Sequence, residues 1–139
     1  MADPYIPYTE APAITYANWI QRVAAYLIDL APPVILLLVL VRIDVALTVI
    51  GWLLALGWIA YNRWYLGGTT GQSVGKKALN ICLVREDTWQ PIGILMAFVR
   101  DVCHLVDSVV CYVGFLFPLW DAKRQTLADK IVRTVVVPV

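Results

Sequence analysis

The stretch that decides the fold is VAAYLIDLAPPVILLLVLV, residues 23–41, in which Asp29 is the only charged side chain. At a rise of about 1.5 Å per residue, a helix of this length crosses the roughly 30 Å hydrocarbon core of a bilayer. The preceding Trp19 and Arg22 suit the headgroup region, where aromatic rings collect and long cationic side chains reach toward water. The sequence therefore predicts a membrane-spanning helix over about residues 19–41.

The composition of the whole chain also indicates a membrane protein. Of its 139 residues, 60% are hydrophobic and 15% are charged, and the mean hydropathy is +0.72. Soluble domains carry about 25% charged residues, and a chain this short cannot bury such an apolar excess. The net charge is only +1 and does not indicate the strongly basic face that nucleic-acid binding requires, so we expect no nucleic-acid partner. The length excludes a large channel or a complete transporter made from one polypeptide.

A second spanning helix is expected directly after the first. Residues 42–44 form a short polar break, residues 45–61 carry no charge, and Asn62 and Arg63 follow. We expect an antiparallel helix over about residues 45–65. The glycine-rich and period-two patterns of residues 66–91 predict a loop and a short strand, and the β-branched residues 131–137 predict a second strand that could pair with it.

Residues 92–120 are mostly apolar, and their length alone would allow a third crossing. Basic residues flank them on both sides: Arg63, Lys76, Lys77 and Arg85 before, and Lys123, Arg124, Lys130 and Arg133 after. A single crossing would place these clusters on opposite sides of the membrane, although both favour the cytosol. We therefore favour a half-inserted helix to about Asp107, a bend near Ser108 and a short helix to Trp120, with a plain third crossing as the alternative. Residues 1–17 are acidic and proline-dotted, which predicts a disordered tail.

Arg22 and Asp29 are seven residues apart and share one face of the first helix. A charge inside a spanning segment usually faces protein, a counter-charge or water. Asp29 is a candidate for a structural role, in which its carboxylate bonds to Tyr26 or to a cation from the third segment. It is also a candidate ion or proton site, because Pro32 and Pro33 deprive two backbone carbonyls at this level of their donors.

Arg100, His104 and Asp107 form a second polar stripe, because they recur at the spacing of one helical face. The stripe fits either a proton relay or the headgroup-facing side of an interfacial helix. The chain shows no nucleophile with a base and an orienting group, so we expect no enzyme activity and no cofactor. The cysteines form no CxxC pair and there is a single histidine, so we expect no metal site.

Two motifs carry a resemblance to a known family. TTGQSVGKKALNI at residues 69–81 and DAKRQTLADKIVRTVVV at residues 121–137, together with Arg22 and Asp29, resemble the RDD family over residues 17–137. That family consists of small, mostly prokaryotic membrane proteins named for one arginine and two aspartates. The resemblance implies that Arg22 and Asp29 are the named arginine and first aspartate, and that Asp129 is the second, with Asp121 as its competitor.

The expected fold is an all-α polytopic membrane protein. It would comprise residues 18–137, with two spanning helices, a half-inserted or third and fourth helical segment, and a small cytosolic β element. We expect it in a prokaryotic cell membrane with both termini in the cytosol. Arg22, Asp29 and either Asp129 or Asp121 are hypothesised to form one coupled charge cluster.

Two functions remain open at the level of sequence. The first is an accessory or assembly subunit of a larger membrane complex, with membrane lipids and a membrane-protein partner or a second copy as its contacts. The alternative is an oligomeric ion or proton transporter, such as a cation/proton exchanger, that uses Asp29.

Overall fold

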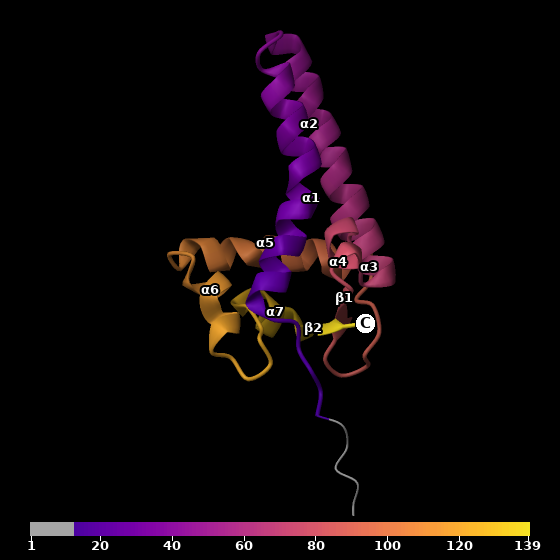
Figure 1. Ribbon diagram of the computed structural model, residues 1–139, viewed down its shortest axis with the longest axis vertical. Helices are drawn as coiled ribbons and strands as arrows, with labels where there is room; N and C mark the ends of the chain where they lie inside the picture. The colour runs from indigo at the N-terminus through magenta and orange to yellow at the C-terminus, as the bar shows by residue number, and fades with distance from the viewer. Residues whose placement is uncertain (1–12) are drawn as a thin grey trace, which may run out of the picture.

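A helical hairpin stands on a compact base (Figure 1). The computed structural model describes residues 13–139. Helix α1 (Trp19–Leu40) and helix α2 (Val45–Ile59) run antiparallel and are joined by a turn at residues 41–44. Asn18 caps the start of α1 in a capping box with Gln21, and the Asp44 carboxylate caps α2 through the backbone N–H groups of Ala46 and Leu47. At the start of both helices, a side chain therefore accepts hydrogen bonds from backbone N–H groups of the first turn, which have no acceptor within the helix.

The second helix is longer than the sequence indicates. It continues from α2 through a π-helical segment, η1 (Ala60–Leu66), into α3 (Gly67–Thr70), as one helix over Val45–Thr70. The loop expected from residue 66 begins only at Gly71, whose φ of 75° ends the helix. The hydroxyls of Thr69 and Thr70 bond back to carbonyls one turn earlier, which supports helix where the glycines predicted a loop.

The base contains the rest of the described chain. Its elements are α4 (Val74–Ala78), β1 (Ile81–Arg85), α5 (Ile94–Val109), α6 (Val113–Leu116), the 3-10 turn η2 (Phe117–Leu119), α7 (Leu127–Val132) and β2 (Thr134–Pro138). Strands β1 and β2 pair antiparallel, from Ile81 opposite Pro138 to Arg85 opposite Thr134, which confirms the expected pairing. One core joins the hairpin to the base and contains Ala17, Ala25, Ile81, Leu83, Ile92, Ala97 and Val136.

Helix α7 was not expected from the sequence, which predicted a strand from residue 131. Thr126 caps this helix in a capping box with Asp129, and Arg133 ends it in the left-handed region with φ 52°. The strand therefore begins only at Thr134. The predicted disordered tail also ends earlier than residue 17, because Ala17 is fully buried and its N–H donates to the Val136 carbonyl at 2.8 Å. The part of that tail at residues 1–12 lies outside the described residues.

Helices α5 and α6 form a sharp elbow. The axis of α5 meets that of the α6–η2 segment at 107° across residues 110–112, close to the bend expected near Ser108. In Figure 1, α5 lies nearly perpendicular to the hairpin, with α6 and α7 on the side of α5 away from the hairpin tip. The pair is therefore no straight third span, in agreement with the expected bent segment.

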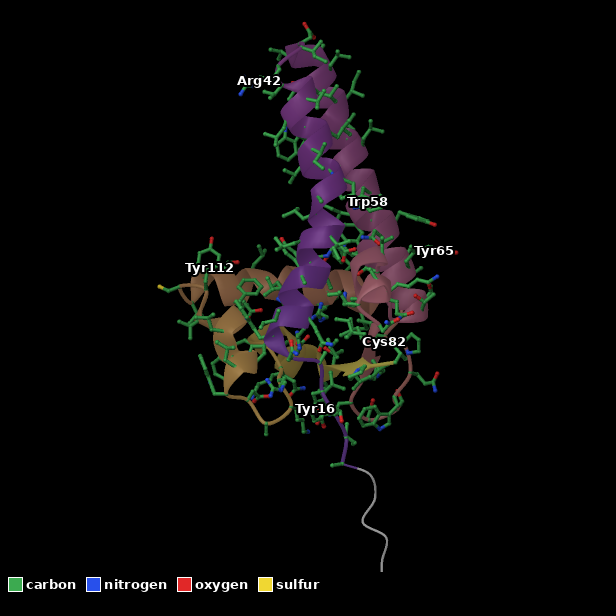
Figure 2. The ribbon with its side chains drawn as sticks, in the orientation of Figure 1. Tyr16, Arg42, Trp58, Tyr65, Cys82 and Tyr112 are labelled. Carbon is green, nitrogen blue, oxygen red and sulfur yellow. The ribbon has the colours of Figure 1, made fainter. Side chains whose placement is uncertain are left out.

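The hairpin exposes most of its apolar surface. Only 17% of the apolar stretch of each long helix is buried within the described chain, and side chains project from the hairpin up to Arg42 at its tip (Figure 2). Two helices that are long and apolar enough to span a membrane, together with a small two-stranded sheet, confirm the fold class predicted from the sequence.

Candidate functional site

Asp29 lies in the middle of α1 and is bonded by neutral groups. Its Oδ1 accepts hydrogen bonds from Asn62 Nδ2 and the Gly75 backbone N–H, each at 2.7 Å, and its Oδ2 accepts one from Ser73 Oγ at 2.5 Å. Asp29 is 7% exposed, whereas Asn62 and Ser73 are fully buried. Both carboxylate oxygens are therefore used to join α1 to the second helix and to α4.

The local sequence explains how these donors reach Asp29. The π-helical segment η1 holds Asn62, whose Oδ1 also accepts the Val74 N–H at 2.8 Å. At Gly75 the backbone of α4 touches α1 so closely that a Cβ would overlap the Ala25 carbonyl. Asn62 and Gly75 are thus the residues that allow α4 to sit against Asp29. The sequence placed Asn62 at the end of the second helix and Gly75 in a loop, and predicted no contact of either with Asp29.

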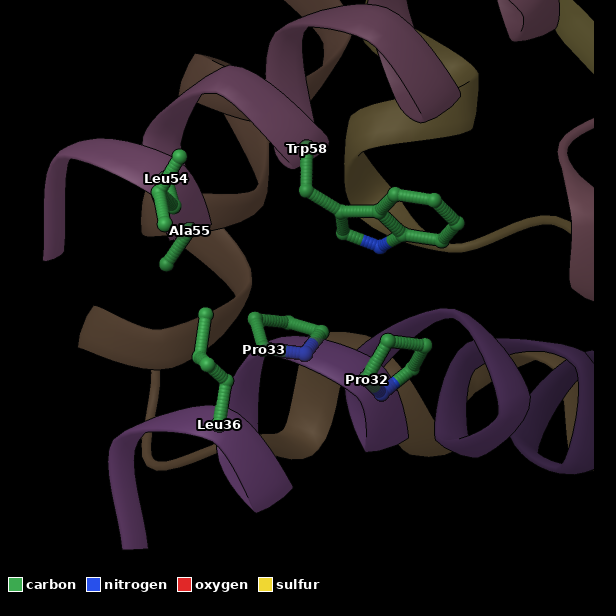
Figure 3. Close-up of a pocket in the computed structure, with 6 residues that line it drawn as sticks. All are labelled: Pro32, Pro33, Leu36, Leu54, Ala55 and Trp58. Carbon is green, nitrogen blue, oxygen red and sulfur yellow. The ribbon is translucent and has the colours of Figure 1, made fainter. Parts of the chain in front are cut away.

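The proline pair deprives backbone carbonyls of their helical donors, and a tryptophan donates a hydrogen bond to one of these carbonyls. Pro33 cannot donate to the Asp29 carbonyl four residues earlier, and Trp58 Nε1 donates to that oxygen at 2.8 Å instead. The Trp58 ring lies across from the prolines in an apolar groove of about 190 Å³ between α1 and α2 (Figure 3). The groove is lined by Pro32, Pro33, Leu36, Leu54, Ala55 and Trp58.

Asp129 forms a second, charged network at the base of α1. Arg22 pairs with its Oδ2, and the Arg100 guanidinium binds its Oδ1 at 2.7 Å. Thr134 Oγ1 and the Thr126 N–H, each at 3.2 Å, complete the shell of this fully buried carboxylate. Burial alone would raise the pKa of Asp129, but the two guanidinium groups override it and hold this pKa far below its usual range.

The polar stripe of α5 faces the base, in contrast to the expected headgroup-facing stripe. Arg100 and Asp107 are buried, and α5 packs closely against α7 along this face. His104 Nδ1 lies 2.7 Å from Asp107 Oδ2, and the His104 ring stacks on Phe115 of α6. The stripe therefore joins α5 to α6 and α7 through Arg100 and His104, whereas Asp107 Oδ1 is buried without a hydrogen-bond partner among the described residues.

A third group of charges connects the second helix to α5. Asp101 accepts hydrogen bonds from Arg63 Nη2 at 2.7 Å and Trp64 Nε1 at 3.0 Å. Lys76, in the last turn of α4, is half-buried and forms no ion pair within residues 13–139. Burial, followed by the nearby charges of Arg100 and Arg63, lowers the pKa of Lys76 to about 8.

The predicted charge cluster is divided into two networks. Arg22 and Asp129 are in direct contact, whereas Asp29 bonds to a different set of residues two turns along α1. Neither Tyr26 nor a cation of the third segment bonds to the Asp29 carboxylate among the described residues, although both had been considered as partners. Asp121 pairs with Lys130 at 2.5 Å near the surface of the base. Sequence reasoning missed Asn62, Ser73 and Trp58, each of which binds Asp29.

Comparisons with known proteins identify the family of the chain. The family model described as "RDD family" matches residues 16–133. The chain is 42% identical, over 157 aligned positions, to a protein named proline-rich antigen homolog from Mycobacterium tuberculosis, covering 92% of this chain and 65% of that protein. It is 38% identical to the proline-rich antigen of Mycobacterium leprae, with 92% and 63% covered. The chain thus spans less than two thirds of the length of these relatives. No solved structure shows a significant match.

Proposed function

This chain belongs to the RDD family, and we propose that its membrane domain serves as an accessory or assembly subunit that docks through its hairpin to helices of a larger membrane complex. The proposal rests first on how the buried carboxylates are used. Every oxygen of Asp29 and Asp129 accepts at least one hydrogen bond from the protein. A cation bound at either carboxylate would have to displace these donors.

The backbone at the proline pair supports the same choice. Transporters coordinate small cations with carbonyls freed at broken helices. Here the Asp29 carbonyl is already engaged by Trp58, and α1 continues as a helix through Pro32 and Pro33. Asp29 and the proline pair, which suggested a cation site in the sequence, therefore connect α1 to the second helix.

The exposed hairpin supplies the surface for docking. Residues such as Leu53, Leu38 and Ile35 are at least 60% exposed, and only a small share of either long helix packs within the chain. In a bilayer, helices associate through close packing and interhelical hydrogen bonds, with little hydrophobic driving force. Partner helices or a second copy would contact this surface.

We further propose that the base lies in the cytosol of a prokaryotic cell. The base carries the basic residues Lys76, Lys77, Lys123, Arg124, Lys130 and Arg133, whereas the hairpin tip carries Arg42 alone. Positive charge near membrane segments favours the cytosolic side. Both the residues before α1 and the C-terminal strand would then be cytosolic.

Site-specific crosslinking in native membranes tests the docking role. A photoreactive residue at Leu53, which is 65% exposed on the hairpin, should give a discrete adduct with one membrane protein or with a second copy. The same residue at Lys123, an exposed position of the base, is the matched control and should not give that adduct. Lipid adducts alone from Leu53 would contradict docking through the hairpin.

Flux measurements on reconstituted protein separate the two functions. Under the accessory role, the wild type shows no pH- or cation-driven flux, and Asp29→Asn reduces stability because it replaces an acceptor that binds Asn62, Ser73 and Gly75. Wild-type flux that Asp29→Asn abolishes, while a thermal unfolding scan shows an intact fold, would instead establish a transporter that uses Asp29.

A further inference from the structure

The α5–α6 elbow exposes a continuous apolar surface. Every exposed residue from 94 to 120 within these helices and their connections is apolar or aromatic: Ile94, Leu95, Phe98, Val102, Leu105, Val106, Val109, Val110, Cys111, Tyr112, Val113, Leu116, Leu119 and Trp120. A helix resting on a membrane surface normally keeps a polar face toward water. The exposed side of α5 contains no such polar residue, so this surface requires an apolar environment.

The polar residues of α5 are covered by the protein itself. Arg100 binds Asp129 of α7, His104 binds Asp107, and Asp101 binds Arg63 and Trp64 of the second helix. Each of these side chains has a partner inside the protein, and Asp107 Oδ1, which has no partner among the described residues, is buried away from water and headgroups. Helix α5 can therefore lie below the headgroups. An isolated helix of this sequence could not, because its polar side chains would have no partners there.

Contacts with α1 fix the depth of the elbow. Arg22, one turn into α1, and Arg100 of α5 bind the same carboxylate. Trp19 Nε1, at the first residue of α1, donates to the Phe115 carbonyl of α6 at 2.9 Å. Because the 22 residues of α1 rise roughly 33 Å, about the thickness of the hydrocarbon core, the elbow lies level with the first turns of the span.

The bend prevents the elbow from reaching the far leaflet. Helix α5 lies nearly perpendicular to the hairpin, and the chain turns by 107° into α6, on the side of α5 away from the hairpin tip (Figure 1). Tyr112 marks the end of the elbow farthest from the hairpin in Figure 2. Within the described residues, the leaflet around the hairpin tip is crossed by α1 and α2 alone.

We propose that the α5–α6 elbow is embedded among the acyl chains of the leaflet on the side of the base, with lipid as its partner. The exposed residues from Ile94 to Trp120 would contact acyl chains, and Trp120 would lie at the interface just before the exposed Lys123. The domain then has a wedge-shaped cross-section, wide in one leaflet and narrow in the other. This inference does not depend on the accessory role.

Lipid quenching of a label on Cys111 tests the depth and the side of the elbow. Cys111 is the exposed cysteine of residues 13–139, whereas Cys82 is buried and Cys103 is half-buried, so a bimane maleimide on the folded protein should react there. The labelled full chain is reconstituted into phosphatidylcholine vesicles that carry nitroxide lipids in one leaflet only. Cys111→Ser gives the background, and Ile43→Cys in that variant reports the hairpin tip.

The two labels should respond to opposite leaflets. The label on Cys111 should be quenched strongly by nitroxide lipids in the leaflet on the side of the base and weakly by aqueous iodide. The label at residue 43 should respond to the other leaflet. Strong iodide quenching of the Cys111 label would place the elbow in water and overturn the proposal. So would quenching from the leaflet of the tip, which indicates a crossing, or protection from both quenchers, which indicates a covering protein.

Discussion

Asp129 is the residue on which two buried guanidinium groups depend for their counter-charge. The side chains of Arg22 and Arg100 are 11% and 8% exposed. Removing one partner of a buried ion pair leaves an uncompensated charge and costs about 3–5 kcal/mol. Asp129→Ala should therefore lower the free energy of unfolding by about that amount, as measured by thermal or denaturant unfolding in mild detergent.

The exposed pair between Arg85 and Asp87 provides the control. Asp87→Ala removes an ion pair whose side chains are 45% and 60% exposed, and should cost about 0–1 kcal/mol. Equal losses in the two variants would show that the buried network does not hold the base to α1. Arg100→Leu combined with Asp129→Leu should recover part of the loss, because two buried charges are then removed together.

Lys76 should make stability depend on pH in the alkaline range. Its pKa in the folded protein is lowered from 10.5 to about 8, so the folded state releases this proton first as pH rises. Between about pH 8 and 10 the unfolded state binds more protons, and the free energy of unfolding therefore increases with pH. Lys76→Met should lack this increase, which unfolding scans of both proteins at pH 7 and pH 10 would detect.

If the wild type and Lys76→Met show the same change in stability between pH 7 and pH 10, the pKa of Lys76 is not lowered in the folded protein. Other alkaline groups titrate equally in the wild type and in Lys76→Met, so only the difference between the two proteins reports on Lys76. Lys77→Met is the matched control, because Lys77 is exposed on the same helix and should behave as the wild type does.

The contact between α4 and α1 depends on a glycine. A Cβ at Gly75 would overlap the Ala25 carbonyl of α1, a backbone atom that cannot move aside alone. Gly75→Ala should force the two elements apart, break the Gly75–Asp29 hydrogen bond and cost about 1–3 kcal/mol. Thermal unfolding and the monodisperse fraction in detergent would measure the loss.

Gly57 on α2 is the matched control for this prediction. Nothing lies within 4 Å of a Cβ placed there, so Gly57→Ala should leave stability unchanged or raise it by up to about 1 kcal/mol. A loss at Gly57 equal to that at Gly75 would mean that the close approach of α4 to α1 is not the cause of the loss at Gly75.

The proline pair and Trp58 should show a compensating interaction. Trp58→Phe removes the N–H that binds the Asp29 carbonyl and leaves a buried acceptor without a partner, at about 1–3 kcal/mol. Pro33→Ala supplies a helical N–H four residues after Asp29. The double variant should therefore be more stable than Trp58→Phe alone, which a double-mutant cycle measured by unfolding would reveal. Additive losses would show that the carbonyl does not need a donor.

Hydropathy predicted the long elements, and local capping chemistry explains the elements that it missed. Residues 23–41 and 45–61 are uniformly apolar, so their helices were evident from the sequence. Helix α7 is only six residues long, and its start depends on the reciprocal bonds between Thr126 and Asp129. A periodicity argument needs a longer segment than this, so it left the start of α7 unassigned and began the following strand at residue 131, inside the last turn of the helix.

The site was predictable in its charges but not in its partners. Arg22 and Asp29 stood out because charge is costly in an apolar segment, whereas Asp129 was singled out by the resemblance to the RDD family. Asn62 and Ser73 are neutral residues common in loops and helix ends, and only the tertiary fold brings them to Asp29. The stripe at Arg100, His104 and Asp107 was recognised as one face, but its burial depends on α7, which the sequence did not reveal.

At the scale of the molecule, strand pairing restricts how many times the chain between the two strands can cross the membrane. Strand β1 precedes α5 and strand β2 follows α7, and the two strands are hydrogen-bonded along their length. They must therefore lie on the same side of the membrane, so the chain between them crosses an even number of times or not at all. The bond from the Ala17 N–H to Val136 places the start of α1 on that side as well.

Cysteine accessibility distinguishes this arrangement from one with a third crossing. In a background without native exposed thiols, Lys77→Cys and Lys123→Cys should react with a membrane-impermeant maleimide from the same side of intact vesicles, because the base holds both positions. Ile43→Cys at the hairpin tip should react only from the other side. A third span through residues 94–119 would instead place residue 123 with residue 43, but this would also pull β2 away from β1. The pairing of these short strands thus makes the topology depend on the fold of the base. If residue 123 reacts from the side of residue 43, the pairing of β1 with β2 should be lost as well.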